Sequence, residues 1–122
     1  MSAWIVIGSI SGLISVAMGA FGAHALSETL DPKMLSVYHT AAQYEMYHAL
    51  ALVALGIWVA QHSAAPWISI SGWSFTIGSI LFSGSLYLLA ITGIRWLGAI
   101  TPAGGLLFMV GWATFAVSAL KR

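Results

Sequence analysis

Glu45 is the only acidic residue inside the long apolar stretches of this chain, and His48 follows it three positions later. Side chains three residues apart are neighbours on a helix surface, so the sequence predicts that a helix presents both on one face. A carboxylate beside an imidazole could transfer a proton, hold a metal ion or bind a polar ligand. These two residues are therefore the first candidates for chemistry.

The apolar stretches of the chain predict four membrane helices. Further polar residues are expected close to Glu45 and His48, toward the membrane face that carries the loops after the first and third helices. Arg95 could reach Glu45 if the third loop folds over the second helix. We expect Glu45 to be buried, about one to two helical turns below that face, and within hydrogen-bond reach of Arg95, His24 or a tyrosine, because carboxylates at membrane depth normally pair or face a cavity. The residues give this candidate cluster: His24, Tyr44, Glu45, His48 and Arg95.

Three interpretations of the cluster stay open. It could be a purely structural polar cap that holds helices in register. It could bind a lipid headgroup, a small polar ligand or a partner protein. It could also carry chemistry or ion movement, through proton transfer between Glu45 and His48.

A metal centre is a weaker alternative. Glu45-Met46-Tyr47-His48 is one Glu-x-x-His step, whereas di-iron helical bundles need two such steps and two further glutamates. A single metal ion held by His24, Glu45 and His48 is the weak remaining candidate, and a haem-binding protein is a related one. The chain has no cysteine. We predict no metal and no cofactor.

The elements that must position these residues are membrane helices. Charged residues are 6% of the 122 residues, against about 25% in soluble domains. One crossing needs about 20 apolar residues, and Met46 to Ile94 contains no charged residue. The sequence predicts one all-α domain, 1–122, folded as an antiparallel four-transmembrane-helix bundle. The predicted spans are 4–26, 34–60, 67–91 and 97–120.

The ends of these spans carry recognisable signals. Ala23-His24-Ala25 has the form of a signal-peptide cleavage site, but a retained first helix fits the long apolar stretch better. Asp31 and Pro32 are typical of a helix start, and Pro102 predicts a late start or a kink in the fourth helix. Lys and Arg residues tie between the two sides, with Lys121-Arg122 favouring termini in the cytoplasm.

Small residues predict close helix packing. The first span carries a stripe at steps of four and three residues, which we expect to contact another helix along its length. The third span carries small residues on both faces, which is compatible with a homo-oligomer. The stripe on the first span consists of Gly8, Gly12, Ser15, Gly19 and Gly22. Trp73 and Trp112 are predicted to be deep packing residues.

Four segments together resemble the YgdD/YwdK-like family of small bacterial inner-membrane proteins, a family of unknown function with mitochondrial relatives. They are residues 19–26 (GAFGAHAL), 44–52 (YEMYHALAL), 82–87 (FSGSLY) and 98–106 (GAITPAGGL). The resemblance implies four transmembrane helices in the bacterial plasma membrane. It implies no catalytic residues, because the family has no established activity. Its motifs add Tyr87 to the candidate cluster.

The sequence therefore predicts an integral protein of the inner (plasma) membrane that acts by binding. An accessory or scaffold role, with membrane lipids or another membrane protein as partner, is favoured over an enzyme. A net charge of +1 gives no basis for binding nucleic acid. The alternatives are a small transporter, channel or proton carrier that uses Glu45 and His48, and a metal- or haem-binding membrane protein.

Overall fold

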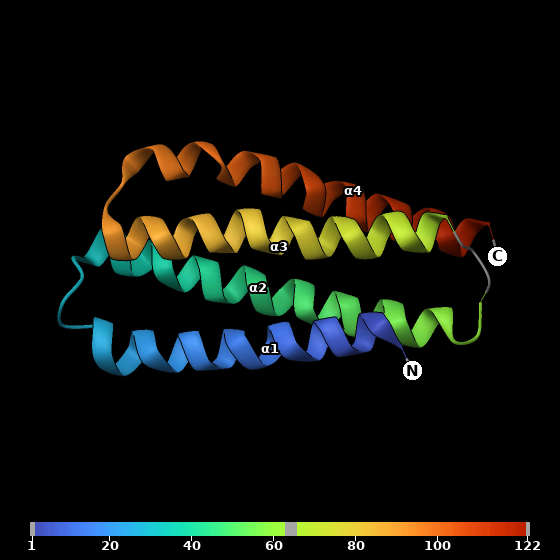
Figure 1. The fold of residues 1–122 in the computed structure, drawn as a ribbon, viewed down its shortest axis with the longest axis horizontal. Coiled ribbons are helices and arrows are strands. Elements are labelled where there is room, and N and C mark those ends of the chain that lie inside the picture. The colour runs from blue at the N-terminus through green and yellow to red at the C-terminus, as the bar shows by residue number, and fades with distance from the viewer. Residues whose placement is uncertain (1, 63–65, 122) are drawn as a thin grey trace.

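The computed structural model describes residues 2–62 and 66–121, and these are almost entirely helical (Figure 1). The predicted segments are helical over nearly their whole length. Residues 63–65 of the predicted middle loop and Arg122 of the predicted basic tail lie outside the described residues. The long helices are α1 (Ala3–Phe21), α2 (Pro32–Val59), α3 (Trp67–Thr92) and α4 (Thr101–Leu120), with a π-helical turn at Gly22–Leu26 and a 3-10 turn at Arg95–Ala99.

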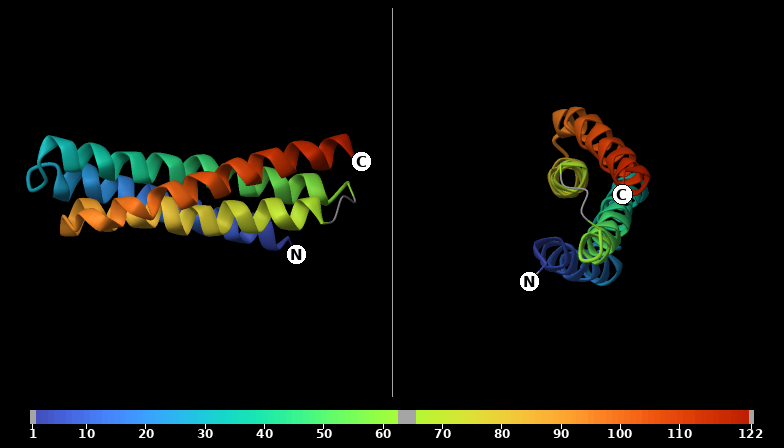
Figure 2. Two further views of the ribbon diagram at one scale, coloured as in Figure 1. Left: turned by 90° about the horizontal axis from the view of Figure 1, so that it is seen from above. Right: turned by 90° about the vertical axis from the view of Figure 1, so that its right-hand side faces the viewer.

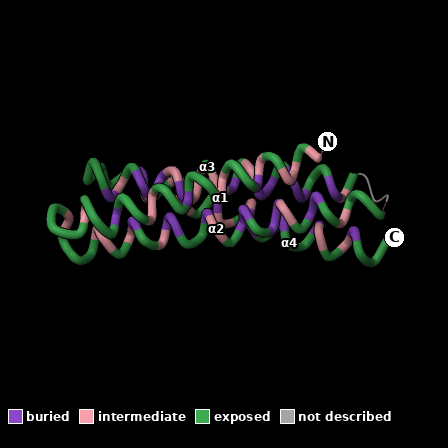
Figure 3. Tube along the Cα trace, turned by 90° about the horizontal axis from the view of Figure 1, so that it is seen from below, coloured by how far each residue is buried: buried purple, intermediate pink, exposed green. Residues whose placement is uncertain are grey.

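The helices form an open, curved row. Each helix packs against the next one in the chain, and consecutive helices run in opposite directions (Figure 1). Seen end-on, α1 and α4 lie at opposite edges of the row (Figure 2). The predicted antiparallel four-helix bundle is therefore not confirmed as a closed bundle. Buried residues alternate with exposed ones along every helix (Figure 3).

Three helical segments of the described chain are long and apolar enough to cross a membrane: Ala3–Leu26, Trp67–Thr92 and Arg95–Leu120. α2 is not among them, although it is 28 residues long. Its polar residues, among them the candidate site residues, lower its mean hydropathy.

Helix boundaries follow local chemistry. The Asp31 side chain accepts a hydrogen bond from the Met34 backbone N–H at 2.8 Å, and Pro32 occupies the first turn of α2, as predicted. α4 begins at Thr101, directly before Pro102, so the predicted late start is confirmed. Gly93 ends α3 with φ of 72°, a left-handed conformation that favours glycine.

The small-residue stripe of the first predicted span contacts α2 over most of its length. A Cβ on Gly8 would lie 2.7 Å from the Ala49 carbonyl oxygen, which is too close for any side chain. The Ser15 hydroxyl donates to the Ala42 carbonyl at 2.7 Å. Gly22 lies directly against the ring of Tyr38, whereas nothing lies within 4 Å of a Cβ on Gly19. The packing prediction is thus confirmed at these positions and wrong at Gly19.

Candidate functional site

Glu45 joins three helices. It is buried, with 8% of its surface exposed. The Tyr87 hydroxyl of α3 donates to Oε1 at 2.8 Å, and the Ser11 hydroxyl of α1 donates to Oε2 at 3.2 Å. The expected contact with a tyrosine is confirmed, and Tyr87 provides it. Arg95 is exposed in the loop before α4 and is not a partner of Glu45.

Glu45 lies far from both ends of its helix. It is at the middle of α2, roughly 20 Å from either end at a rise of 1.5 Å per residue. Ser11 is likewise near the middle of α1. The predicted depth of one to two helical turns below a membrane face stays a prediction. The hydroxyl groups of the neighbouring helices receive the carboxylate at the centre of the molecule.

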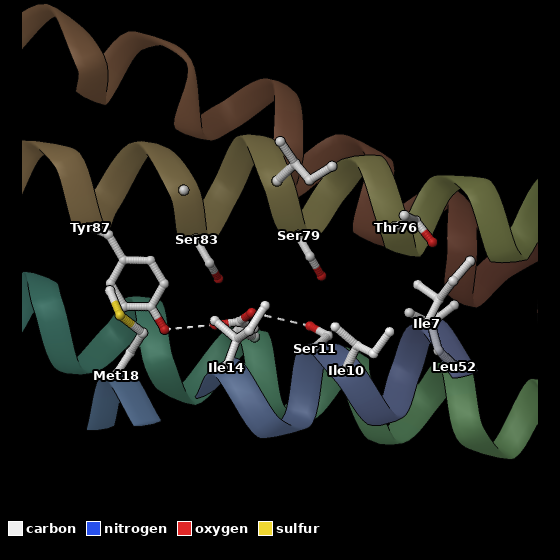
Figure 4. Close-up of a pocket in the computed structure, with 13 residues that line it drawn as sticks. Ile7, Ile10, Ser11, Ile14, Met18, Leu52, Thr76, Ser79, Ser83 and Tyr87 are labelled. Carbon is white, nitrogen blue, oxygen red and sulfur yellow. Dashed lines mark hydrogen bonds between the residues drawn. The ribbon is translucent and has the colours of Figure 1, made fainter. Parts of the chain in front are cut away.

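A pocket of about 440 Å³ opens beside Glu45, between α1, α2 and α3 (Figure 4). Its polar side consists of the carboxylate and hydroxyl groups. The hydroxyls of Ser79 and Ser83 point from α3 across this space (Figure 4). The remaining walls are apolar, and they are formed chiefly by Ile7, Ile10, Ile14, Met18, Leu52 and Ile80.

The two serine hydroxyls in the pocket have no hydrogen-bond partner. Ser83 is 1% exposed, and its Oγ has no partner among the described residues; the same holds for the Oγ of Ser79. Leaving a buried hydroxyl without a hydrogen bond costs about 1–3 kcal/mol. Native proteins rarely leave such groups unpaired, and each one calls for an explanation. The pocket therefore has unused hydrogen-bonding capacity next to a buried carboxylate.

His48 faces a different part of the molecule. Its Nδ1 lies 2.7 Å from the Tyr44 carbonyl oxygen, and the Trp112 indole N–H donates to its Nε2 at 3.1 Å. A carbonyl only accepts and an indole only donates, so the proton is on Nδ1 and the ring is neutral. The ring also stacks on Phe108, with centroids 3.5 Å apart and planes 3° apart. Both ring nitrogens of His48 therefore have a hydrogen-bond partner.

Glu45 and His48 therefore do not form a common site, although they are three residues apart. Glu45 lines the pocket against α1 and α3, whereas His48 lines a second groove of about 380 Å³ against α3 and α4. The expectation of one shared face is wrong, because α2 lies in the interior of the row and has neighbours on both sides. The second groove is largely aromatic; Tyr44, Tyr47, Phe82, Phe108, Met109 and Trp112 line it with His48.

The other predicted residues are scattered. His24 is exposed in the π-helical turn after α1. Tyr44 is 38% exposed and packs on Phe82 in the aromatic groove. Among residues 2–62 and 66–121, no three His, Cys, Asp or Glu side chains converge closely enough to hold a metal ion. The weak candidate set of His24, Glu45 and His48 is not brought together.

The hydroxyl groups that complete the pocket were not predicted as site residues. The small residues of the third span, which include Ser79 and Ser83, were interpreted only as packing residues, and Ser11 was not considered. A signal was present, since Thr76, Ser79, Ser83 and Tyr87 follow each other at steps of three and four. Such steps place them on one helix face. A row of hydroxyls ending in a tyrosine, inside an apolar span, predicts a polar lining.

A known protein family matches the larger part of this chain. The model of a family described as "Protein of unknown function (DUF423)" matches residues 18–105, more than half of the chain. The chain belongs to the DUF423 family. The predicted resemblance is confirmed, because the relatives include YwdK and YgdD. The match includes Glu45, Ser83 and Tyr87 but not Ser11.

Individual relatives are similar to this chain over nearly its whole length. UPF0382 membrane protein YwdK of Bacillus subtilis is 44% identical, with 99% of this chain and 98% of the relative covered. UPF0382 membrane protein SSP2132 of Staphylococcus saprophyticus is 45% identical, with 99% of each covered. UPF0382 inner membrane protein YgdD of Escherichia coli is 38% identical, with 96% and 88% covered. No solved structure matches the chain.

The names of these relatives and the three helical segments that could cross a membrane both indicate a membrane protein. This chain is a multi-pass membrane protein, and the predicted location in the inner (plasma) membrane is confirmed.

Proposed function

We propose that this protein is a non-catalytic binding protein of the plasma membrane, and that the pocket beside Glu45 holds its ligand. The observation that carries the proposal is the pair of unpartnered hydroxyls, Ser79 and Ser83, facing a pocket with a buried carboxylate. Ligand pockets are typically apolar, enclose about 300–1,000 Å³ and contain a few convergent polar groups. The pocket beside Glu45 has these properties.

The proposal includes four membrane crossings in an antiparallel bundle. α2 adds the fourth crossing to the three apolar segments. Its 28 residues extend about 42 Å, more than the roughly 30 Å of hydrocarbon. Lys33 lies in its first turn, and Glu45 is its only other charged residue. α2 therefore needs to bury a single charge, and the neighbouring helices provide its hydrogen bonds.

Binding is favoured over the alternatives of a proton carrier or a metal protein. A relay between Glu45 and His48 would need a hydrogen-bonded path, but the ring nitrogens of His48 bond to Tyr44 and Trp112 on the far side of α2. The same bonds leave no lone pair on His48 for a metal ion or a haem. Association into a homo-oligomer and binding of another membrane protein stay predictions.

The pocket can be tested by filling it. Gly84 lines the pocket, and nothing lies within 4 Å of a Cβ built on it. Gly84→Leu should therefore place a side chain in the pocket without displacing backbone. Gly19→Leu is the matched control, because Gly19 also has no neighbour within 4 Å and does not line the pocket.

The measurement is native mass spectrometry of the full chain, extracted from its own membrane in a neutral maltoside detergent. We expect the unsubstituted protein and Gly19→Leu to retain a bound small molecule, and Gly84→Leu to lose it. A protein that retains nothing, or equal retention by both variants, would contradict the proposal.

The four-span topology has its own test. The chain has no cysteine, so single cysteines can be introduced at Glu28, Arg95 and Lys121. A membrane-impermeant maleimide added to intact cells should label the first two from one side and the third only after lysis, or the reverse. Labelling of all three from the same side would refute four crossings.

A further inference from the structure

We propose that the ligand of the Glu45 pocket is a lipophilic primary ammonium, an alkyl chain that ends in a protonated amine. This inference rests on the proposed function and names its ligand class. It follows from the charge of the pocket, from its hydrogen-bonding groups and from its apolar walls.

The pocket contains a buried carboxyl group without a positive partner among the described residues. Glu45 is buried, and the described Lys and Arg residues are exposed near helix ends: Lys33, Arg95 and Lys121. A charge removed from water is expensive unless it is paired and hydrogen-bonded. Two hydroxyl donors supply hydrogen bonds to Glu45 but no opposite charge. A cationic ligand would supply the charge that the described protein groups lack.

The unused atoms of the pocket can all accept hydrogen bonds, as an ammonium requires. An ionised carboxylate has about four acceptor positions, and the bonds from Tyr87 and Ser11 use two of them. The Oγ atoms of Ser79 and Ser83 can accept as well. A primary ammonium has three N–H donors and no acceptor. One such group could bond to the carboxylate and to both serine hydroxyls together.

The rest of the pocket suits an alkyl chain, and its composition disfavours anionic and quaternary ammonium head groups. A phosphate or carboxylate head would meet Glu45 and no cation. A quaternary ammonium has no N–H donor and is recognised by aromatic cages, whereas Tyr87 is the only aromatic residue that lines this pocket in the described chain. The aliphatic walls would contact the chain, and these are Ile7, Ile10, Ile14, Met18, Leu52 and Ile80.

The test compares four probes with one chain length, so that partition into detergent or bilayer is matched as closely as the head groups allow. The probes are tetradecylamine, tetradecyltrimethylammonium, tetradecanol and tetradecanoate. Binding is measured on the full chain in nanodiscs of neutral lipid, at a pH at which the amine is protonated. We expect tetradecylamine to bind one per chain, about tenfold or more tighter than the other three, as hydrogen bonds to a charged group imply.

Variants link the preference to named atoms. Glu45→Gln keeps the shape of the side chain and should lose the preference for the amine over the alcohol. Ser83→Ala should weaken amine binding several-fold without lowering the melting temperature of the ligand-free protein, because this hydroxyl has no partner to lose among the described residues. If Glu45→Gln fails to fold, Ser83→Ala alone decides the outcome. Tyr44→Phe removes a hydroxyl from the other side of α2 and should change nothing.

The outcomes separate this inference from the proposed function. Equal binding of tetradecanol and tetradecylamine, abolished by Gly84→Leu, would overturn the ammonium and leave a pocket for neutral amphiphiles. Binding of the amine that neither Gly84→Leu nor Ser83→Ala weakens would overturn the ammonium site in this pocket. If none of the four probes binds, the ammonium proposal is also overturned. The native mass spectra decide the proposed function separately.

Discussion

The two sides of α2 differ in how completely their polar groups are satisfied. On one side, His48 has a partner for each ring nitrogen and stacks closely on Phe108. On the other side, Glu45 has two hydroxyl donors, but the hydroxyls of Ser79 and Ser83 beside it have no hydrogen-bond partner among residues 2–62 and 66–121. The difference separates a polar group that holds helices together from polar groups that are available to a ligand. Burial alone does not distinguish them, since His48 and Glu45 are both buried.

The largest expected effect comes from breaking the satisfied side. His48→Ala removes a stacked ring and leaves the Trp112 indole N–H without its acceptor. The cavity and the lost hydrogen bond together should lower the free energy of unfolding by about 3 kcal/mol. Thermal melting in maltoside detergent, followed by helical circular dichroism, measures the loss. Ligand retention in the Glu45 pocket should persist below the lowered melting temperature, and its selective loss would contradict the separation of the two sides.

A smaller effect isolates the bond between His48 and Trp112. Trp112→Phe keeps an aromatic ring but removes the donor, and a double-mutant cycle with His48→Ala gives the coupling between the two side chains. Interhelical hydrogen bonds in membrane proteins average about 0.6 kcal/mol, with a maximum of about 1.7. We expect a coupling of about 1 kcal/mol. A coupling near zero would show that stacking on Phe108, not this bond, holds the imidazole.

The smallest effects compare two buried serines of α3. The Ser71 hydroxyl donates to the Gly111 carbonyl of α4 at 2.8 Å, whereas the Ser83 hydroxyl has no partner in the described part of the chain. Ser71→Ala should therefore cost about 0.6 kcal/mol, and Ser83→Ala should cost nothing or stabilise the ligand-free protein slightly. Melting temperatures of both variants test this order. The reverse order would mean that Ser83 has a structural partner and that the pocket is not an open site.

The helices, and the importance of Glu45, could be predicted from the sequence. Apolar stretches with Asp31 and Pro32 at a boundary determine helices locally, and the cost of a charge in hydrocarbon marks Glu45 without knowledge of its neighbours. The structure confirms burial of Glu45 and a tyrosine partner.

The separation of Glu45 and His48 into two different pockets could not be predicted in this way. Whether Glu45 and His48 share a face depends on where the other helices pack around α2. The two side chains diverge by roughly 60° after three residues at 3.6 residues per turn, which is enough for them to meet different neighbours. The role of Trp112 depends equally on a contact between residues 64 positions apart. Spacing within one helix contains no information about such partners.

The most direct measurement is a density map of the full chain, purified from its own membrane in neutral detergent. The account predicts density that is not protein between α1 and α3, with one end within hydrogen-bond distance of Glu45 and Ser83 and the remainder along Ile10 and Ile14. A pocket closed by movement of α1, with the Ser79 and Ser83 hydroxyls bonded to protein atoms, would contradict it.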